Sequence, residues 1–137
     1  MTESKHHEVV VIGAGVCGIY QLYRLLELGI DATVLEAGSD LGGTWYWNRY
    51  PGARFDSESH SYSYSFSEEL LQEWDWSEYF AGQPETLRYL GYVADKFNLR
   101  EHMQFDCRVK SAVFDESRSV WKISLQDGRS LTCKILL

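Results

Sequence analysis

Three glycines and one acidic residue near the start of the chain have the spacing of a dinucleotide-binding motif. Gly13, Gly15 and Gly18 form the pattern GxGxxG, and Glu36 follows eighteen residues after the last of them. In this motif the first glycine permits a tight turn, the second lets the backbone approach a pyrophosphate, and the third allows a helix to pack closely on a strand. Free amide groups at the start of that helix bind the phosphates. The pattern therefore predicts a nucleotide-binding site.

The carboxylate of Glu36 indicates which kind of nucleotide is bound. At the carboxyl end of a second strand, a carboxylate accepts hydrogen bonds from both hydroxyls of a ribose and repels a 2′-phosphate. NADP is therefore disfavoured at this motif, which does not by itself separate FAD from NAD. Gly42 and Gly43 would bring a second backbone segment close to the same cofactor, and the greater length of FAD favours FAD. A plain glycine-rich turn is the alternative interpretation.

The elements around the motif are those that it requires. Residues 9–12 form an apolar, β-branched run typical of a strand buried in a parallel sheet. Apolar residues recur at helical spacing over 16–28, Gly29 can end that helix, and 32–35 predict a second strand. Together these segments predict a parallel βαβ unit with a right-handed crossover.

The remainder of the chain divides into an irregular segment and a regular one. Residues 37–83 show no clear period, which predicts a functional segment or one packed on a partner. A helix is expected from Pro84, and residues 103–133, with a hairpin turn at 127–128, predict a small antiparallel meander. The fold class is therefore α/β, a Rossmann-like FAD-binding domain with a parallel βαβ sheet and a meander. The run 134–137 predicts a strand without a cap, so we expect this domain to be incomplete at its C-terminus.

Composition excludes several other classes of protein. The chain has 137 residues, of which 45% are hydrophobic, and this is enough for a core. Its formal net charge of −7 argues against a nucleic-acid partner. A polar start and the lack of a long apolar run predict no membrane segment and a cytoplasmic location.

The cysteines and histidines suggest no chemistry of their own. Three cysteines without a CxxC pair predict neither a disulfide framework nor a metal site, and we expect buried thiols at Cys17, Cys107 and Cys133. The histidines belong to no nucleophile or metal motif, so His60 and His102 are expected at the surface. Residues 6–7, both histidine, are expected in a flexible tail.

The stretch Gly43–Asp56, with the sequence GTWYWNRYPGARFD, resembles the corresponding segment of type I Baeyer–Villiger monooxygenases. The likeness covers almost all of the chain and is closest to the phenylacetone and steroid monooxygenase branch. It implies an enzyme that holds FAD, takes a hydride from NADPH and uses O2 to convert a ketone into an ester or lactone through a C4a-peroxyflavin. N-hydroxylating and flavin-containing monooxygenases share the glycines but not the tryptophan-rich string, and remain an alternative.

The resemblance also implies roles for individual residues. The ADP part of FAD would be bound by Gly13, Gly15, Gly18 and Glu36, with Gly43 beside them. The flavin would be lined by Thr44, Trp45, Asp56 and Tyr62, while the backbone of Val109 would meet the adenine. The nicotinamide side would be lined by Arg54, Phe55 and Asp56.

Asp56 is the one catalytic residue that the resemblance implies. In the family its counterpart orients an active-site arginine, which would lie beyond residue 137. The alternative is a turn-forming aspartate that pairs locally with Arg54.

Aromatic residues are concentrated in one part of the chain, with fourteen of the twenty between residues 45 and 92. For Trp45 and Tyr62 the resemblance favours contact with the flavin. Plain packing on a helix-like face is instead expected for Trp74, Trp76, Tyr79 and Phe80.

Two motifs of the family do not occur among the 137 residues. These are a second GxGxxG for NADPH and the motif Phe-x-Gly-x-x-x-His-x-x-x-Trp-Pro. The resemblance therefore implies that residues 1–137 are the N-terminal part of an FAD domain, and that the rest of the polypeptide supplies the NADPH domain. A free-standing nucleotide-binding module without catalysis is the alternative.

Overall fold

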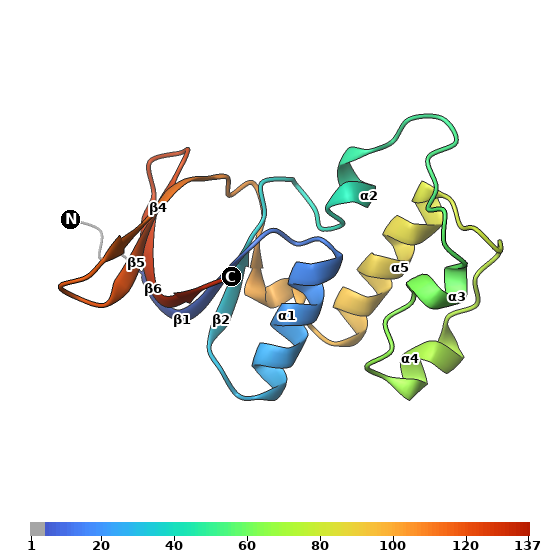
Figure 1. Cartoon of the computed structure of the whole chain (residues 1–137), viewed down its shortest axis with the longest axis horizontal. Helices are drawn as coiled ribbons and strands as arrows, with labels where there is room; N and C mark the ends of the chain where they lie inside the picture. The colour runs from blue at the N-terminus through green and yellow to red at the C-terminus, as the bar shows by residue number, and fades with distance from the viewer. Residues whose placement is uncertain (1–4) are drawn as a thin grey trace.

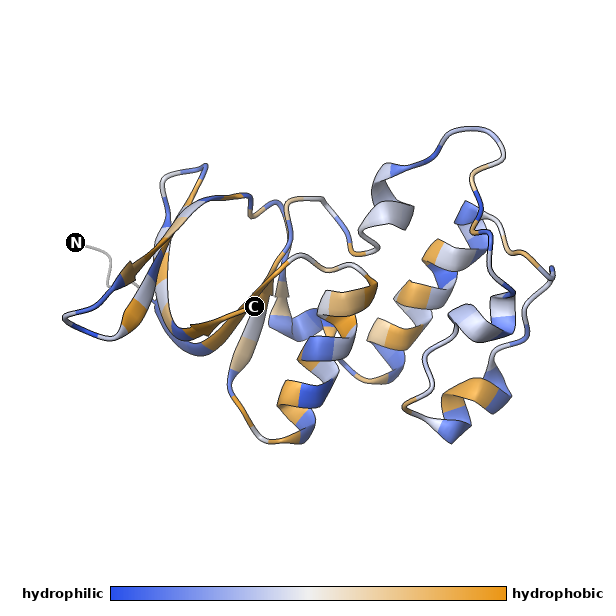
Figure 2. Ribbon diagram, in the orientation of Figure 1, coloured by the Kyte–Doolittle hydropathy of each residue, from blue (hydrophilic) through white to orange (hydrophobic). Residues whose placement is uncertain are grey.

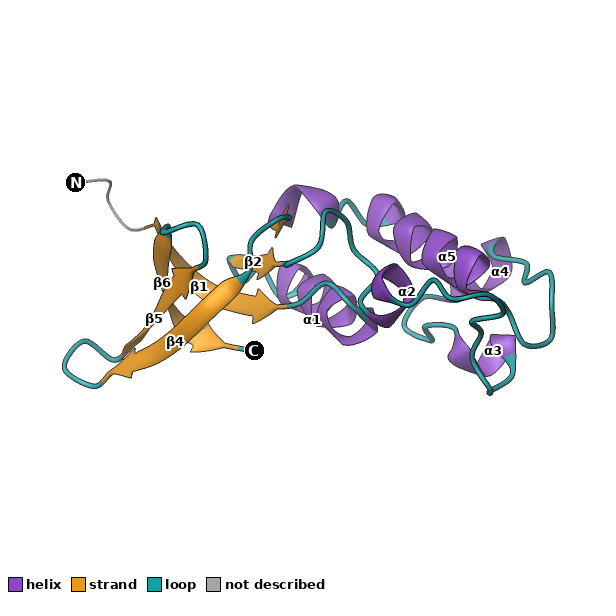
Figure 3. Ribbon diagram, turned by 90° about the horizontal axis from the view of Figure 1, so that it is seen from above, coloured by secondary structure: helices purple, strands orange, loops and turns teal. Residues whose placement is uncertain are grey.

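A computed structural model describes residues 5–137. Its strands lie toward one end of the molecule and most of its helices toward the other (Figures 1 and 3). In chain order the elements are β1 (Lys5–Ile12), α1 (Val16–Glu27), β2 (Ala32–Leu35), α2 (Thr44–Trp47), α3 (Ser59–Tyr62), α4 (Glu68–Glu73), α5 (Gln83–Lys96), the 3-10 turn η1 (Arg100–His102), β3 (Met103–Gln104), β4 (Val109–Asp115), β5 (Val120–Leu125) and β6 (Ser130–Leu136).

The strands form one six-stranded sheet in the order β3-β2-β1-β6-β5-β4. Strands β3, β2, β1 and β6 are parallel to one another, whereas β6, β5 and β4 form an antiparallel meander. The predicted α/β fold with a parallel βαβ unit and a meander is therefore confirmed. Strand β6 belongs to both parts, because it pairs with β1 on one side and with β5 on the other.

One detail of the predicted strands is wrong. Residues 103–107 are not part of the meander, because β3 pairs in parallel with β2 at the opposite edge of the sheet, with Val34 opposite Met103. The strand predicted at 134–137 is present as the end of β6, which runs without a break from residue 130 to 136. Its backbone pairing with β1 continues through Leu137, whose amide donates to the carbonyl of Val10 at 2.9 Å.

The βαβ unit forms because the apolar surfaces of β1 and α1 meet. Val9 and Val11 on β1 are at most 1% exposed, and they share a core with Ile19 and Leu22 on α1, which are fully buried. Gly29 ends the helical segment with a φ of +72°, a conformation that a residue with a Cβ rarely adopts. Figure 2 shows the resulting apolar stripes on α1 and α5 among polar residues.

The irregular segment 37–83 contains three short helices that its sequence period does not reveal. The side chain of Ser67 begins α4 by accepting a hydrogen bond from the amide of Leu70 at 3.2 Å. The helix-like face proposed for residues 74–80 is wrong, because Trp74 ends α4 in an extended conformation. Trp76 still packs on the buried Tyr89, with 4.8 Å between ring centroids, whereas Tyr79 and Phe80 are exposed.

The structure also corrects the expectations for Cys17 and the first histidines. Cys17 is exposed, whereas Cys107 and Cys133 are buried, as expected. His7 lies in β1 rather than in a tail, and its ring nitrogen Nδ1 is 3.2 Å from a carboxylate oxygen of Asp31. Within residues 5–137, no helix has the length and apolarity to cross a membrane.

Candidate dinucleotide-binding site

The glycine turn at the end of β1 has the geometry that its spacing predicts. Gly13 follows the strand with a φ of +100°, and its amide donates to the carbonyl of Leu35 on β2 at 2.9 Å. A Cβ atom on Gly18 would lie 1.9 Å from the carbonyl oxygen of Gly13, so no larger residue fits there. The turn is thereby held close to both strands and to the first turn of α1.

The second glycine segment lies directly against the first. The amide of Gly42 donates to the carbonyl of Ala14 at 2.8 Å, and a Cβ atom on Gly43 would lie 2.8 Å from the Cα atom of Gly15. Gly42 and Gly43 also have positive φ angles of +131° and +54°. The two backbone segments therefore approach each other closely, and this approach depends on the absence of side chains.

The start of α1 presents free amide groups next to this turn. The first helical hydrogen bond runs from the amide of Ile19 to the carbonyl of Gly15, at 3.0 Å. Among the described residues, no backbone acceptor faces the amides of Val16, Cys17 and Gly18, and no acidic side chain lies in the first turn. These amides border a cavity of about 400 Å³ that is lined by Ile12, Gly13, Gly15, Val16, Cys17, Gly18, Gly43, Thr44, Trp45 and Tyr62.

Glu36 follows directly after β2, and it makes two hydrogen bonds that the sequence did not reveal. Its side chain is 4% exposed, and its two carboxylate oxygens accept hydrogen bonds from the amides of Ala14 and Gly38, each at 2.7 Å. The acid therefore holds the glycine turn directly. Glu36 also lines a cavity of about 290 Å³, together with Val109, Trp47 and Arg108 and with Gly13, Gly15 and Gly43.

This second cavity adjoins the first, since both are bordered by Ile12, Gly13, Gly15 and Gly43. The structure thus brings Val109, from β4, to the same place as Glu36, from the end of β2. Trp47 and Arg108 line the same cavity although sequence reasoning did not select them. Trp47 belongs to the tryptophan-rich string, whereas Arg108 carries no sequence signal beyond its position next to Val109.

An aromatic wall borders the first cavity on the side of α3. It consists of Trp45 and Tyr62, with Phe55 packed against both. The indole nitrogen Nε1 of Trp45 donates to the hydroxyl oxygen of Tyr62 at 3.0 Å. Phe55 stacks on the ring of Tyr62, with 4.3 Å between centroids and 13° between planes. Trp45 and Phe55 are each 6% exposed, and of the two only Trp45 lines the cavity, while Phe55 packs against the rings of Trp45 and Tyr62.

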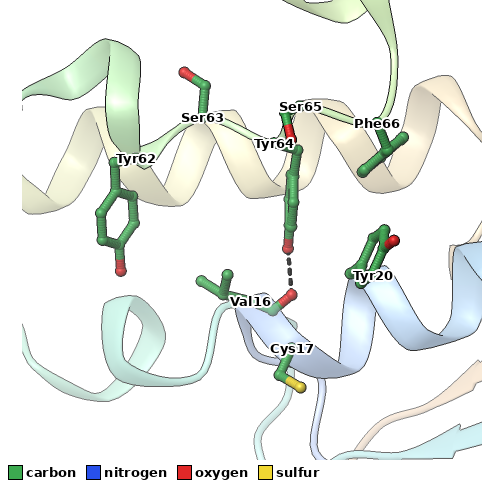
Figure 4. Close-up of a pocket in the computed structure, with 8 residues that line it drawn as sticks. All are labelled: Val16, Cys17, Tyr20, Tyr62, Ser63, Tyr64, Ser65 and Phe66. Carbon is green, nitrogen blue, oxygen red and sulfur yellow. Dashed lines mark hydrogen bonds between the residues drawn. The ribbon is translucent and has the colours of Figure 1, made fainter.

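A third cavity, of about 480 Å³, continues from this wall along α1 (Figure 4). Its lining includes Tyr20, Tyr64 and Phe66, and the hydroxyl of Tyr64 donates to the carbonyl of Val16. Burial raises the pKa of the Tyr64 phenol far above its ordinary value. The phenol of Tyr64 therefore stays neutral, and its hydrogen bond joins the segment after α3 to the start of α1.

Arg54 and Asp56 lie apart from these cavities. The guanidinium of Arg54 donates to Glu78 at 3.0 Å and to the carbonyl of Phe80 at 2.7 Å, and not to Asp56. The side chain of Asp56 is exposed, and no cation of residues 5–137 forms an ion pair with it. The alternative of a local pair between Arg54 and Asp56 is therefore not observed.

Comparison with known proteins agrees with this geometry. Residues 11–75 match the family described as NAD(P)-binding Rossmann-like domain. Acetone monooxygenase (methyl acetate-forming) of Gordonia sp. strain TY-5 is 46% identical over 130 residues, which are 95% of this chain and 24% of that protein.

Two solved structures are similar over nearly the whole chain. Oxidized steroid monooxygenase bound to NADP has 51% identity and a TM-score of 0.94, and the match covers 96% of this chain and 25% of that one. The complex of OTEMO with FAD and NADP has 46% identity and a TM-score of 0.91, covering 98% of this chain and 25% of that one.

The fold and the glycine turn thus define a Rossmann-like nucleotide-binding domain. More narrowly, the chain is a homologue of the Baeyer–Villiger monooxygenases, and its structure matches theirs. The resemblance found in the tryptophan-rich string is confirmed. The chain spans about a quarter of the length of the curated relatives it matches.

Proposed function

We propose that this chain is the FAD-binding, N-terminal part of an NADPH- and O2-dependent Baeyer–Villiger monooxygenase that converts ketones into esters or lactones. The main observation behind the proposal is the close contact of two glycine segments. The backbone of Gly43 lies against that of Gly15, next to the free amides at the start of α1. Relatives described as binding FAD and NADP, and as acting on ketones, support it.

The residues present fit the ADP part of FAD. A Cβ atom on Gly13 would meet no atom within 4 Å, and the cavity that Gly13 lines is also lined by Val16 and Cys17. A diphosphate placed there would receive backbone hydrogen bonds and the favourable field of the helix N-terminus. Glu36 would accept hydrogen bonds from the ribose, and its negative charge favours a ribose without a 2′-phosphate.

The remaining residues of the site would orient the cofactor and exclude water. Redox chemistry, namely hydride acceptance from NADPH and reaction with dioxygen, is what a flavin supplies when bound. Thr44, Trp45 and Tyr62 would line the flavin end, where packed rings keep water away from the reacting atoms. The backbone of Val109 would meet the adenine beside Glu36.

Asp56 is the residue that we propose for catalysis. It is exposed and without a cationic partner among the described residues, which suits a carboxylate that pairs with an arginine of another part of the polypeptide. Asp56→Ala should therefore leave FAD bound and the fold unchanged while it impairs oxidation of the ketone. Unchanged turnover in that variant would exclude the role.

The activity is tested with the complete polypeptide that carries this chain. Purified protein is supplied with NADPH, a panel of linear, cyclic and aromatic ketones, and isotopically labelled O2, and products are identified by mass spectrometry. The proposal predicts ketone-dependent oxidation of NADPH and one labelled oxygen atom in an ester or lactone. Oxidation of amines instead of ketones would favour an N-hydroxylating enzyme, and nucleotide binding without any turnover would favour a non-catalytic module.

A further inference from the structure

The loop that follows β2 ends in the second glycine segment, and backbone hydrogen bonds hold it near both ends. Near its start the amide of Asp106 donates to the carbonyl of Gly38 at 2.9 Å. At its end the amide of Gly42 donates to the carbonyl of Ala14 at 2.8 Å. The stretch between these two bonds, residues 39–41, makes no backbone hydrogen bond with another backbone group of residues 5–137, so side chains fix its path.

Asp40 attaches this stretch to Arg100, which lies sixty residues further along the chain in η1. One carboxylate oxygen of Asp40, Oδ1, accepts hydrogen bonds from the amide of Leu41 at 2.8 Å and from Nη1 of Arg100 at 2.6 Å. Within the described part of the chain, Arg100 is the only cation that pairs with Asp40. The other polar side-chain contact, at 2.7 Å between the hydroxyls of Ser39 and Tyr46, joins the stretch only to the nearby helix α2. The link to Arg100 is therefore the one that reaches a distant element.

Arg100 is itself attached to α5. Its Nε atom donates to Oδ1 of Asp95, in the last turn of α5, at 2.6 Å. The N–H groups of a guanidinium are held in one plane, so a single arginine can keep two carboxylates at a set separation. The same helix also contacts the loop directly, because a Cβ atom on Gly42 would collide with the side chain of Leu87. The second glycine segment is therefore confined between α5 and the glycine turn.

We infer that Arg100 is a positioning residue for the cofactor: by joining Asp40 to Asp95, it holds the second glycine segment against the glycine turn and so raises the affinity for FAD. The inference rests on the proposed function. Arg100 lines neither of the two cavities beside the glycine turn, so it acts through the segment and not by touching the nucleotide. Its side chain is 38% exposed, and an exposed ion pair adds little to the stability of the fold. The contact of Gly43 with Gly15, in contrast, is close enough that a shift of the segment changes the site.

The test measures FAD affinity in the complete polypeptide. Arg100→Gln removes the charge, and it should raise the dissociation constant of FAD, from fluorescence titration of the apoprotein, by roughly 2- to 5-fold. Arg100→Lys keeps the charge and should restore part of the affinity. Lys122→Gln is the matched control, because it removes an ion pair of the same 2.6 Å length, with Asp115 in the meander, and it should bind FAD like the parent.

Asp40→Asn provides a second measurement because it changes the other partner of the same ion pair. It should raise the dissociation constant by a similar factor, and its combination with Arg100→Gln should add little, since both act through one contact. In the protein without cofactor, hydrogen exchange at the amide of Gly42 should become faster in both variants. Exchange at Gly29, beyond the far end of α1, should stay unchanged.

Three results would show that the inference is wrong when the parent binds FAD. The first is an Arg100→Gln variant that binds FAD as tightly as the parent, and the second is a loss of affinity without faster exchange at Gly42. The third is an Arg100→Lys variant that loses as much affinity as Arg100→Gln. A parent that binds no FAD would instead overturn the proposed function itself, and this inference with it.

Discussion

The glycine turn and the aromatic wall form two sides of one cavity, but they are built in different ways. The turn, from β1 through α1 to β2, is set by backbone contacts between residues close in sequence, such as Gly18 against Gly13. The wall joins residues from separate segments, with Trp45 bonded to Tyr62 and both packed on Phe55. The first side binds by its backbone, whereas the second depends on large side chains that hold each other in place.

This difference predicts which kind of substitution destabilises each region. In the turn the addition of one carbon atom is harmful, because backbone atoms occupy the space. In the wall the removal of atoms is harmful, because the neighbouring rings lose their support. We therefore expect substitutions in the two regions to lower the free energy of unfolding by different amounts.

The largest effect is expected from Phe55→Ala. Phe55 is 6% exposed and supports both Trp45 and Tyr62, so its truncation should lower the free energy of unfolding by about 3–5 kcal/mol. Chemical denaturation of the complete polypeptide measures this loss. Tyr79→Ala is the control, because Tyr79 is 60% exposed and its truncation should cost about 0.5 kcal/mol or less. Equal losses in the two variants would show that the wall is not a packed unit.

Gly18→Ala should have the next largest effect. The new Cβ atom would lie 1.9 Å from the carbonyl oxygen of Gly13, and we expect a loss of about 3 kcal/mol together with loss of FAD binding. Gly91→Ala is a matched control on α5, where the nearest atom is the end of the Arg100 side chain at 3.4 Å. Because alanine favours the helix, this control should be neutral or more stable by up to about 1 kcal/mol. A harmless Gly18→Ala would contradict the close packing of the turn.

Glu36→Gln tests the bond between the acid and the glycine turn. An amide group has one oxygen where the carboxylate has two, so either Ala14 or Gly38 loses its acceptor, at a cost of about 2 kcal/mol. Hydrogen exchange of those two amides in the protein without cofactor should become faster. If exchange is unchanged and only FAD affinity falls, Glu36 acts on the ribose alone.

The smallest effect concerns alkaline pH and Tyr64. Burial raises the pKa of its phenol above that of the unfolded chain, so the folded state keeps the proton more tightly. The contribution of Tyr64 to stability is complete below pH about 10, where an unfolded tyrosine titrates, and declines as pH rises further. Tyr64→Phe should therefore flatten the loss of stability above that pH, whereas the exposed Tyr50→Phe should keep the parental slope.

The same contrast explains how much could be predicted from the sequence. Spacing alone predicted the strand, turn, helix and strand from residue 9 to Glu36, because period and glycine positions are local signals. The helices of segment 37–83 were missed because each has only four to six residues, too few for a period. The hydrogen bond between Trp45 and Tyr62 could not be predicted either, because it joins residues seventeen positions apart that no long helix or strand connects.

The histidines and Cys17 illustrate a further limit. The sequence at residues 6–7 predicts a flexible tail, yet β1 includes these residues because they pair with β6, whose residues lie more than a hundred positions away. Cys17 was expected to be buried, but it is exposed in the first turn of α1. The pairing of residues 6–7 depends on a partner distant in sequence, which a single-sequence pattern does not encode.

The central claim is that the joined glycine segments and Glu36 bind the ADP part of FAD. Its most direct test is to release the nucleotide from the purified complete polypeptide, identify it by mass spectrometry, and repeat the measurement with Gly18→Ala. We expect FAD in an equimolar amount in the parent and its loss in the variant, with Gly91→Ala retaining it. A parent that holds no flavin, or a Gly18→Ala variant that holds as much FAD as the parent, would contradict the claim.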